Sequence, residues 1–72
     1  MHTKRIAVFP GSFDPITTGH VDLVRRALTI FDEIIIAIGV NSQKQTLFPV
    51  EERKRWIQKV FEGDSRIRVD VF

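Results

Sequence analysis

The 72-residue sequence predicts a protein of the α/β class, built from one domain in which strands and helices alternate. Three observations support this prediction. Short apolar runs alternate with amphipathic segments whose apolar residues recur with the period of a helix. The middle run, residues 33–40, is apolar almost without alternation, which is typical of a parallel strand covered on both faces. The order strand, helix, strand, helix, strand is the βαβαβ half of a Rossmann-like, doubly wound parallel sheet with right-handed crossovers.

The first strand and the first helix follow directly from the N-terminus. Residues 5–9 form a short apolar run that Pro10 and Gly11 end, which predicts a buried strand followed by a turn. Thr17 and Thr18 are both candidate N-caps of the next helix. Its apolar face is expected from residues at helical spacing, which are Val21, Val24, Ala27, Leu28 and Phe31.

Residues 33–40 are predicted as the central strand, and Pro49 opens a second helix after a polar stretch at 41–46. We expect the apolar residues of this helix to face inward, and these are Val50, Trp56, Ile57, Val60 and Phe61. We expect its charged residues to be mostly exposed, and these are Glu51, Glu52, Arg53, Lys54, Arg55 and Lys59. Residues 63–65 end the helix. Residues 66–72 then alternate strictly, which predicts a last strand with Ile67, Val69 and Val71 on one face.

The composition excludes several classes of protein. Four Gly and three Pro are too few for a collagen-like chain, and 43% hydrophobic residues are too many for a disordered one. The absence of cysteine excludes a disulfide framework and a thiolate nucleophile. Eleven basic residues are interleaved with nine acidic ones, so we expect no nucleic-acid partner. No apolar run approaches the roughly 20 residues of a membrane span, and no signal-peptide pattern is present, so we expect a cytoplasmic protein without a membrane partner.

Residues 10–20 are the first candidate for a functional site. Ligands of open α/β sheets bind beyond the carboxyl ends of the strands, where this segment lies. It offers two glycines, three hydroxyl groups and a helix N-terminus, a combination that suits a phosphate group. It matches neither Gly-x-Gly-x-x-Gly nor the Gly-Lys-Ser/Thr of a P-loop. Taken singly, Gly11, Gly19, Ser12, Thr18 and Asp14 each have a structural interpretation as turn or capping residues.

His20 is the candidate catalytic residue of this segment. A lone histidine is usually structural, but this one lies in the first turn of a helix beside the hydroxyl-rich loop. The helix dipole disfavours a protonated imidazole at that position. We therefore expect His20 to have a functional role and hypothesise that it acts as a neutral imidazole N–H donor.

Residues 10–20, Pro-Gly-Ser-Phe-Asp-Pro-Ile-Thr-Thr-Gly-His, resemble the first signature of the nucleotidyltransferase superfamily, (His/Thr)-x-Gly-His. Within that superfamily the chain most resembles the bacterial phosphopantetheine adenylyltransferase family. Thr17 stands at the first motif position, where other members normally have His. Lys44 follows the second strand, and the pattern continues with Phe48, Glu51, Glu52 and Arg53.

The resemblance implies transfer of an adenylyl group from ATP, carried with Mg²⁺, to 4′-phosphopantetheine, which gives dephospho-coenzyme A and pyrophosphate without a covalent intermediate. It implies that His20 stabilises the transition state. It also implies that Ser12, Phe13 and His20 bind the nucleotide, and that Ser12 and Lys44 bind the second substrate. No residue is expected to hold a metal directly. The family implies a homo-oligomer, commonly a hexamer.

The chain differs from the family in its length, since members are about twice this size. The Arg-Gly-x-Arg segment and the Ser-rich loop that complete the family's ATP site do not occur in residues 1–72. We therefore expect these residues to be the N-terminal portion of a single nucleotidyltransferase domain, with little or no activity alone. Two alternatives stay open: a nicotinate-mononucleotide adenylyltransferase or cytidylyltransferase of the same superfamily, and a non-catalytic nucleotide-binding fragment.

Overall fold

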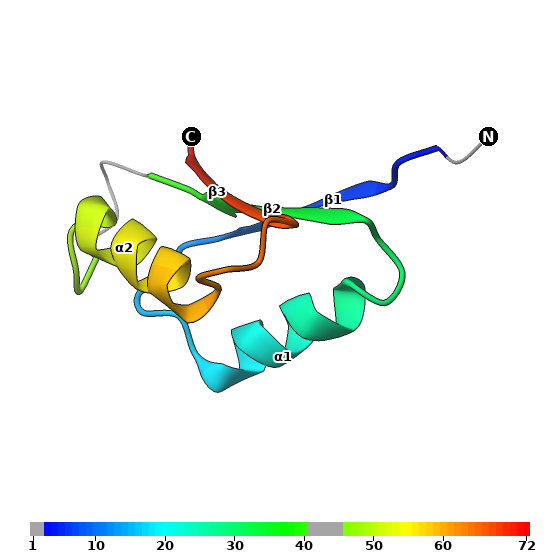
Figure 1. Cartoon of the computed structure of the whole chain (residues 1–72). Helices are drawn as coiled ribbons and strands as arrows, with labels where there is room; N and C mark the ends of the chain where they lie inside the picture. The colour runs from blue at the N-terminus through cyan, green and yellow to red at the C-terminus, as the bar shows by residue number, and fades with distance from the viewer. Residues whose placement is uncertain (1–2, 41–45) are drawn as a thin grey trace.

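A computed structural model describes residues 3–40 and 46–72 and contains the predicted elements in the predicted order. They are β1 (Ile6–Gly11), α1 (Thr18–Ala27), β2 (Glu33–Ile38), α2 (Val50–Val60) and β3 (Ile67–Val71). The strands are parallel and lie in the order β1-β2-β3, so β2 is the central strand. Both helices lie on the same face of the sheet (Figure 1). The βαβαβ unit is therefore confirmed.

β1 continues through Pro10 and Gly11, so the turn predicted there is wrong. Pro10 pairs with Ala37, and Gly11 pairs with Ile38. The carbonyl of Gly11 accepts a hydrogen bond from the Gly39 N–H at 3.0 Å. Along a parallel strand, the main-chain groups of every second residue bond to the same neighbouring strand. Gly11 bonds on the side of β2, so the adjacent Pro10 directs its nitrogen away from β2. The proline therefore costs the β1–β2 pair no hydrogen bond.

The helices cover only one face of the sheet. Ile34, Ile36 and Ile38 of β2 are buried beneath them, whereas Ile6 and Val8 on the opposite face are 50% and 60% exposed. The prediction that residues 33–40 are covered on both faces is therefore wrong for the part of the chain that the structure describes. The β2 side chains on the opposite face are nevertheless partly shielded from solvent, because β2 lies between β1 and β3 in the sheet. Within the described residues there is no second layer of helices.

The hydrophobic core lies between the sheet and the two helices. Its fully packed members come from all of these elements and from the first loop: Phe13, Val24, Ile34, Ile36, Ile38, Ile57 and Phe61. α1 ends at Ala27, earlier than its apolar pattern suggests, and Phe31 packs against the core from beyond the helix. Neither described helix has the length and apolar character needed to cross a membrane.

α2 buries a different stripe from the one predicted. Ile57 and Phe61 are buried as expected, but Val60 is 41% exposed and Arg53 only 3% exposed. The reason is helical geometry, since residues 53, 57 and 61 are spaced four apart and share one face. Val60 lies beside that face. Val71, at the end of β3, is also more exposed than predicted.

Replacing Ile57 by Ala is expected to lower the free energy of unfolding by about 2–5 kcal/mol, because the fully buried side chain would leave a cavity between α2 and the sheet. Chemical denaturation followed by circular dichroism measures this loss. The Val60→Ala variant is the control, because it removes an exposed side chain from the same helix and should cost less than about 1 kcal/mol. Equal losses would contradict the assignment of the buried face.

Candidate functional site

A pocket of about 480 Å³ opens at the carboxyl ends of β1 and β2, where the sequence places the candidate site. It is lined by residues of both strand ends, of the loop before α2 and of the end of the chain: Pro10, Gly11, Ser12, Gly39, Val40, Thr46 and Phe72. Ser12 is the lining residue that the sequence assigns to phosphate binding. Its hydroxyl makes no hydrogen bond to another described residue, so it is available to a ligand.

Phe13 anchors the first loop in the hydrophobic core. Its ring is 2% exposed and makes an edge contact with Phe9 at 5.3 Å between ring centroids. Its backbone has φ of 48°, in the left-handed region that non-glycine residues seldom occupy. Gly11 makes room for this arrangement, because a Cβ there would lie 3.0 Å from the Phe13 ring. With its side chain buried, Phe13 has only its backbone to offer a ligand.

His20 is held at the start of α1 by a reciprocal capping box with Thr17, which decides between the two candidate N-caps. The His20 N–H donates to the Thr17 hydroxyl at 3.3 Å, and the Thr17 N–H donates to His20 Nδ1 at 3.0 Å. The imidazole ring also packs against the edge of Phe13, with 4.9 Å between ring centroids. The position of the ring is therefore fixed by the helix cap and by the core.

The capping box also indicates which nitrogen of His20 carries a proton, since the Thr17 backbone nitrogen and hydroxyl oxygen lie 3.0 Å and 3.1 Å from Nδ1. Nδ1 accepts from the Thr17 N–H, so it must be unprotonated, and a neutral ring then carries its hydrogen on Nε2. A protonated ring would have no lone pair on Nδ1 to accept this hydrogen bond. Nε2 has no hydrogen-bond partner among the described residues. The geometry thus leaves Nε2 available to a ligand, and the donor role of His20 stays a prediction.

Asp14 joins the first loop to the loop before α2. Its carboxylate accepts hydrogen bonds from the Leu47 N–H at 2.5 Å and from the Phe48 N–H at 2.8 Å. Asp14 was predicted as a turn residue, but its partners lie 33 and 34 positions away in the sequence. The carboxylate is therefore a structural tie between the two loops that border the pocket.

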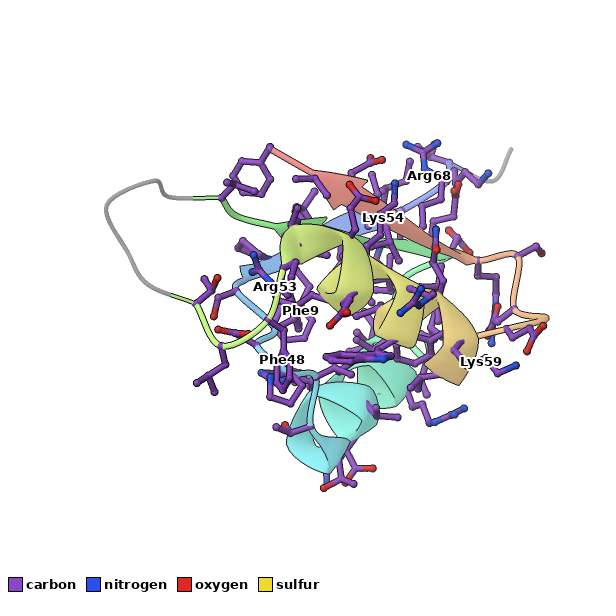
Figure 2. The ribbon with its side chains drawn as sticks, turned by 90° about the vertical axis from the view of Figure 1, so that its left-hand side faces the viewer. Phe9, Phe48, Arg53, Lys54, Lys59 and Arg68 are labelled. Atoms are coloured by element: carbon purple, nitrogen blue, oxygen red, sulfur yellow. The ribbon has the colours of Figure 1, made fainter. Side chains whose placement is uncertain are left out.

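Arg53 is a residue of the site that the sequence reasoning missed. It is the only charged side chain that is buried in the described part of the chain. Its Nε donates to the carbonyl of Phe48 at 2.9 Å, and its Nη1 donates to the carbonyl of Ser12 at 2.8 Å. Figure 2 shows the side chain between the first turns of α2 and the end of β1. The signal that would have found it is its position four residues before Ile57 on the buried face.

The structure brings only some of the predicted site residues together. Ser12 lines the pocket, whereas Phe13 and His20 do not line it; Phe13 follows Ser12 in the first loop, and the His20 ring packs against the Phe13 ring. Lys44 lies outside the described residues. Within residues 3–40 and 46–72, no group of three or more His, Cys, Asp or Glu is arranged to hold a metal ion. Asp14, the carboxylate of the loop, is already bound to backbone amides.

Comparisons with known proteins give a consistent family. The family model of cytidylyltransferase-like proteins matches residues 8–72. A phosphopantetheine adenylyltransferase of Leptospira biflexa is 56% identical over 69 residues, which cover 96% of this chain and 43% of that protein. Proteins of the same name from Geobacter metallireducens and Thermotoga neapolitana are 54% and 50% identical, over 96% and 92% of this chain. The chain spans less than half of the length of these curated relatives.

Solved structures support the fold alone. The NadR protein in complex with NAD and AMP-PNP superposes with a TM-score of 0.84 at 22% sequence identity. The match covers 96% of this chain and 20% of that one. A NadR protein in complex with NR gives the same TM-score. The Rossmann-like arrangement predicted from the sequence is thereby confirmed.

We expect His20 to populate one neutral tautomer, with the proton on Nε2, because Nδ1 accepts the Thr17 hydrogen bond. Nitrogen-15 NMR under mildly alkaline conditions, where imidazole is neutral, distinguishes the two ring nitrogens by chemical shift. A scalar coupling across the hydrogen bond from the Thr17 amide nitrogen to Nδ1 would identify the donor. The Thr17→Ser variant keeps the hydroxyl cap and should keep the same tautomer. A protonated Nδ1, or a mixture of tautomers like that of free imidazole, would contradict the capping-box assignment.

Proposed function

Since this chain belongs to the cytidylyltransferase-like family, we propose that the protein transfers an adenylyl group from Mg-ATP to 4′-phosphopantetheine, forming dephospho-coenzyme A and pyrophosphate. The observation that carries the proposal is that almost this whole chain, which includes the loop of residues 10–20, matches relatives that bear the name phosphopantetheine adenylyltransferase. The proposal concerns the full-length protein, since this chain spans less than half of those relatives.

The proposed reaction needs one nucleophilic displacement at phosphorus. A phosphate oxygen of 4′-phosphopantetheine forms a bond to the α-phosphorus of ATP, and the bond from that phosphorus to the bridging oxygen of the β-phosphate breaks. Pyrophosphate leaves with the bonding electron pair. The protein contributes alignment of the two anions and stabilisation of the charge on the transferring group. No covalent bond to the chain is required.

Each proposed residue has a group suited to its part in this reaction. His20 has a free Nε2–H that would donate to an oxygen of the α-phosphate. The Ser12 hydroxyl and the Phe13 N–H would bind the phosphates of the substrates, because neither has a hydrogen-bond partner in the described part of the chain. Lys44 would bind the phosphate of 4′-phosphopantetheine. We propose that Mg²⁺ arrives with ATP, bound to its phosphates.

We further propose that the protein is cytoplasmic and assembles as a homo-oligomer, with a hexamer as the expected state. Residues from the other part of the full-length protein would complete the ATP site. Sedimentation of the full-length protein tests the assembly. A monomer at micromolar concentration would contradict this part of the proposal.

The choice of the second substrate is tested by an assay of pyrophosphate release with purified full-length protein, Mg-ATP and a panel of acceptors. We expect release with 4′-phosphopantetheine and none with nicotinate mononucleotide, because Thr17 stands where the other superfamily members normally have His. Glycerol phosphate with Mg-CTP serves as the cytidylyltransferase control. Activity only with a different acceptor would overturn the proposed substrate, and binding of ATP without any transfer would favour a nucleotide-binding protein.

The His20→Ala variant is expected to lower kcat by about 10²–10³-fold while the KM for ATP changes much less, because the Nε2–H stabilises charge that grows during the transfer. Steady-state kinetics of the full-length protein measure both constants. Asp22→Asn is the matched control, since Asp22 is exposed two residues further along α1 and makes no hydrogen bond or ion pair with a described residue. A rise in KM with unchanged kcat would show that His20 only binds substrate.

A further inference from the structure

Arg53 lies on α2 and makes hydrogen bonds to both loops that border the pocket. Its guanidinium donates to the carbonyl of Ser12 in the first loop and to the carbonyl of Phe48 in the second. We propose that Arg53 is a positioning residue of the nucleotide site, which orients the Phe13 N–H for a phosphate of ATP. This inference rests on the proposed function, because it assigns a role in binding the same substrate.

The orientation follows from the geometry of one peptide group. The Ser12–Phe13 peptide is trans, so its C=O and N–H point in opposite directions. Arg53 holds the C=O at 2.8 Å, and the N–H of Phe13 is therefore directed away from α2. No described residue accepts a hydrogen bond from this N–H. Rotation of the peptide would break the Arg53 bond, so the guanidinium selects the orientation that leaves the amide free.

The charge of Arg53 supports the same role. A buried guanidinium is costly unless it is paired, and both of its hydrogen-bond partners here are neutral carbonyl groups. Within the described residues no carboxylate forms an ion pair with it. The carboxylate of Asp14 in the first loop binds the Leu47 and Phe48 amides instead. The positive charge behind the loop is therefore left to favour an anion bound in front of it.

The test is an NMR titration of the full-length protein with Mg-ATP, read at the Phe13 amide. In the unmodified protein we expect the Phe13 resonance to shift as ATP binds. In the Arg53→Met variant we expect ATP to bind at least about tenfold more weakly, with little shift at Phe13, because both the charge and the orienting bond are lost. The Arg53→Lys variant keeps the charge but has one nitrogen in place of the fork that spans two carbonyls, so we expect a smaller loss of affinity and a reduced shift at Phe13.

Arg55→Met is the matched control, because it removes the same charge from an exposed position two residues along α2. We expect it to bind ATP like the unmodified protein. Circular dichroism shows which variants are folded, and if Arg53→Met is unfolded the Arg53→Lys result decides. Folded Arg53 variants that match Arg55→Met in affinity and in the Phe13 shift would overturn the role of Arg53. If ATP produces no shift at Phe13 in the unmodified protein, and no pyrophosphate is released, the proposed function fails as well.

Discussion

The burial of the Phe13 ring is the constraint on which the functional loop depends. The ring lies in the same core as Val24 of α1 and the isoleucines of β2, so the loop is anchored by the interaction that stabilises the whole fold. This burial requires the left-handed backbone of Phe13 and the missing side chain of Gly11. His20 then packs against the same ring. A loop that would otherwise be mobile thus acquires the order of the core, which is what pre-organised binding of an anion needs.

The site is built from polar ties as well as from apolar packing. Asp14 and Arg53 join the loop after β1 to the loop before α2 through four hydrogen bonds, all of them to backbone groups. A charged side chain that bonds to a backbone group fixes the path of the chain whatever side chain its partner carries. The two loops are therefore held together as one unit. A displacement of α2 would move Arg53 and, through it, the backbone of Ser12.

The order and type of the elements could be predicted from the sequence because the apolar periods are strong over 33–40 and along both helices. The loop and its histidine could be predicted from residue types and from the resemblance at residues 10–20. The continuation of β1 through Pro10 could not be predicted, because a proline disrupts only the side of a strand toward which its nitrogen points, and that side is decided by pairing. Arg53 was assigned to the surface on its charge, although its place in the helical period put it inward. Contacts such as Asp14 with Leu47 depend on how distant loops meet, and no local pattern encodes them.

The place of Pro10 in β1 has a consequence for any strand that would extend the sheet beyond β1. The outer edge of β1 presents the main-chain groups of Ile6 and Val8 but lacks an N–H at Pro10. A strand added there would lose its ladder partner at the level of Ala37, immediately beside the pocket. Pairing would weaken toward that end, and the two strands would separate beside the pocket. One imino acid thereby both weakens pairing at an edge that no described strand covers and favours a crevice beside the pocket.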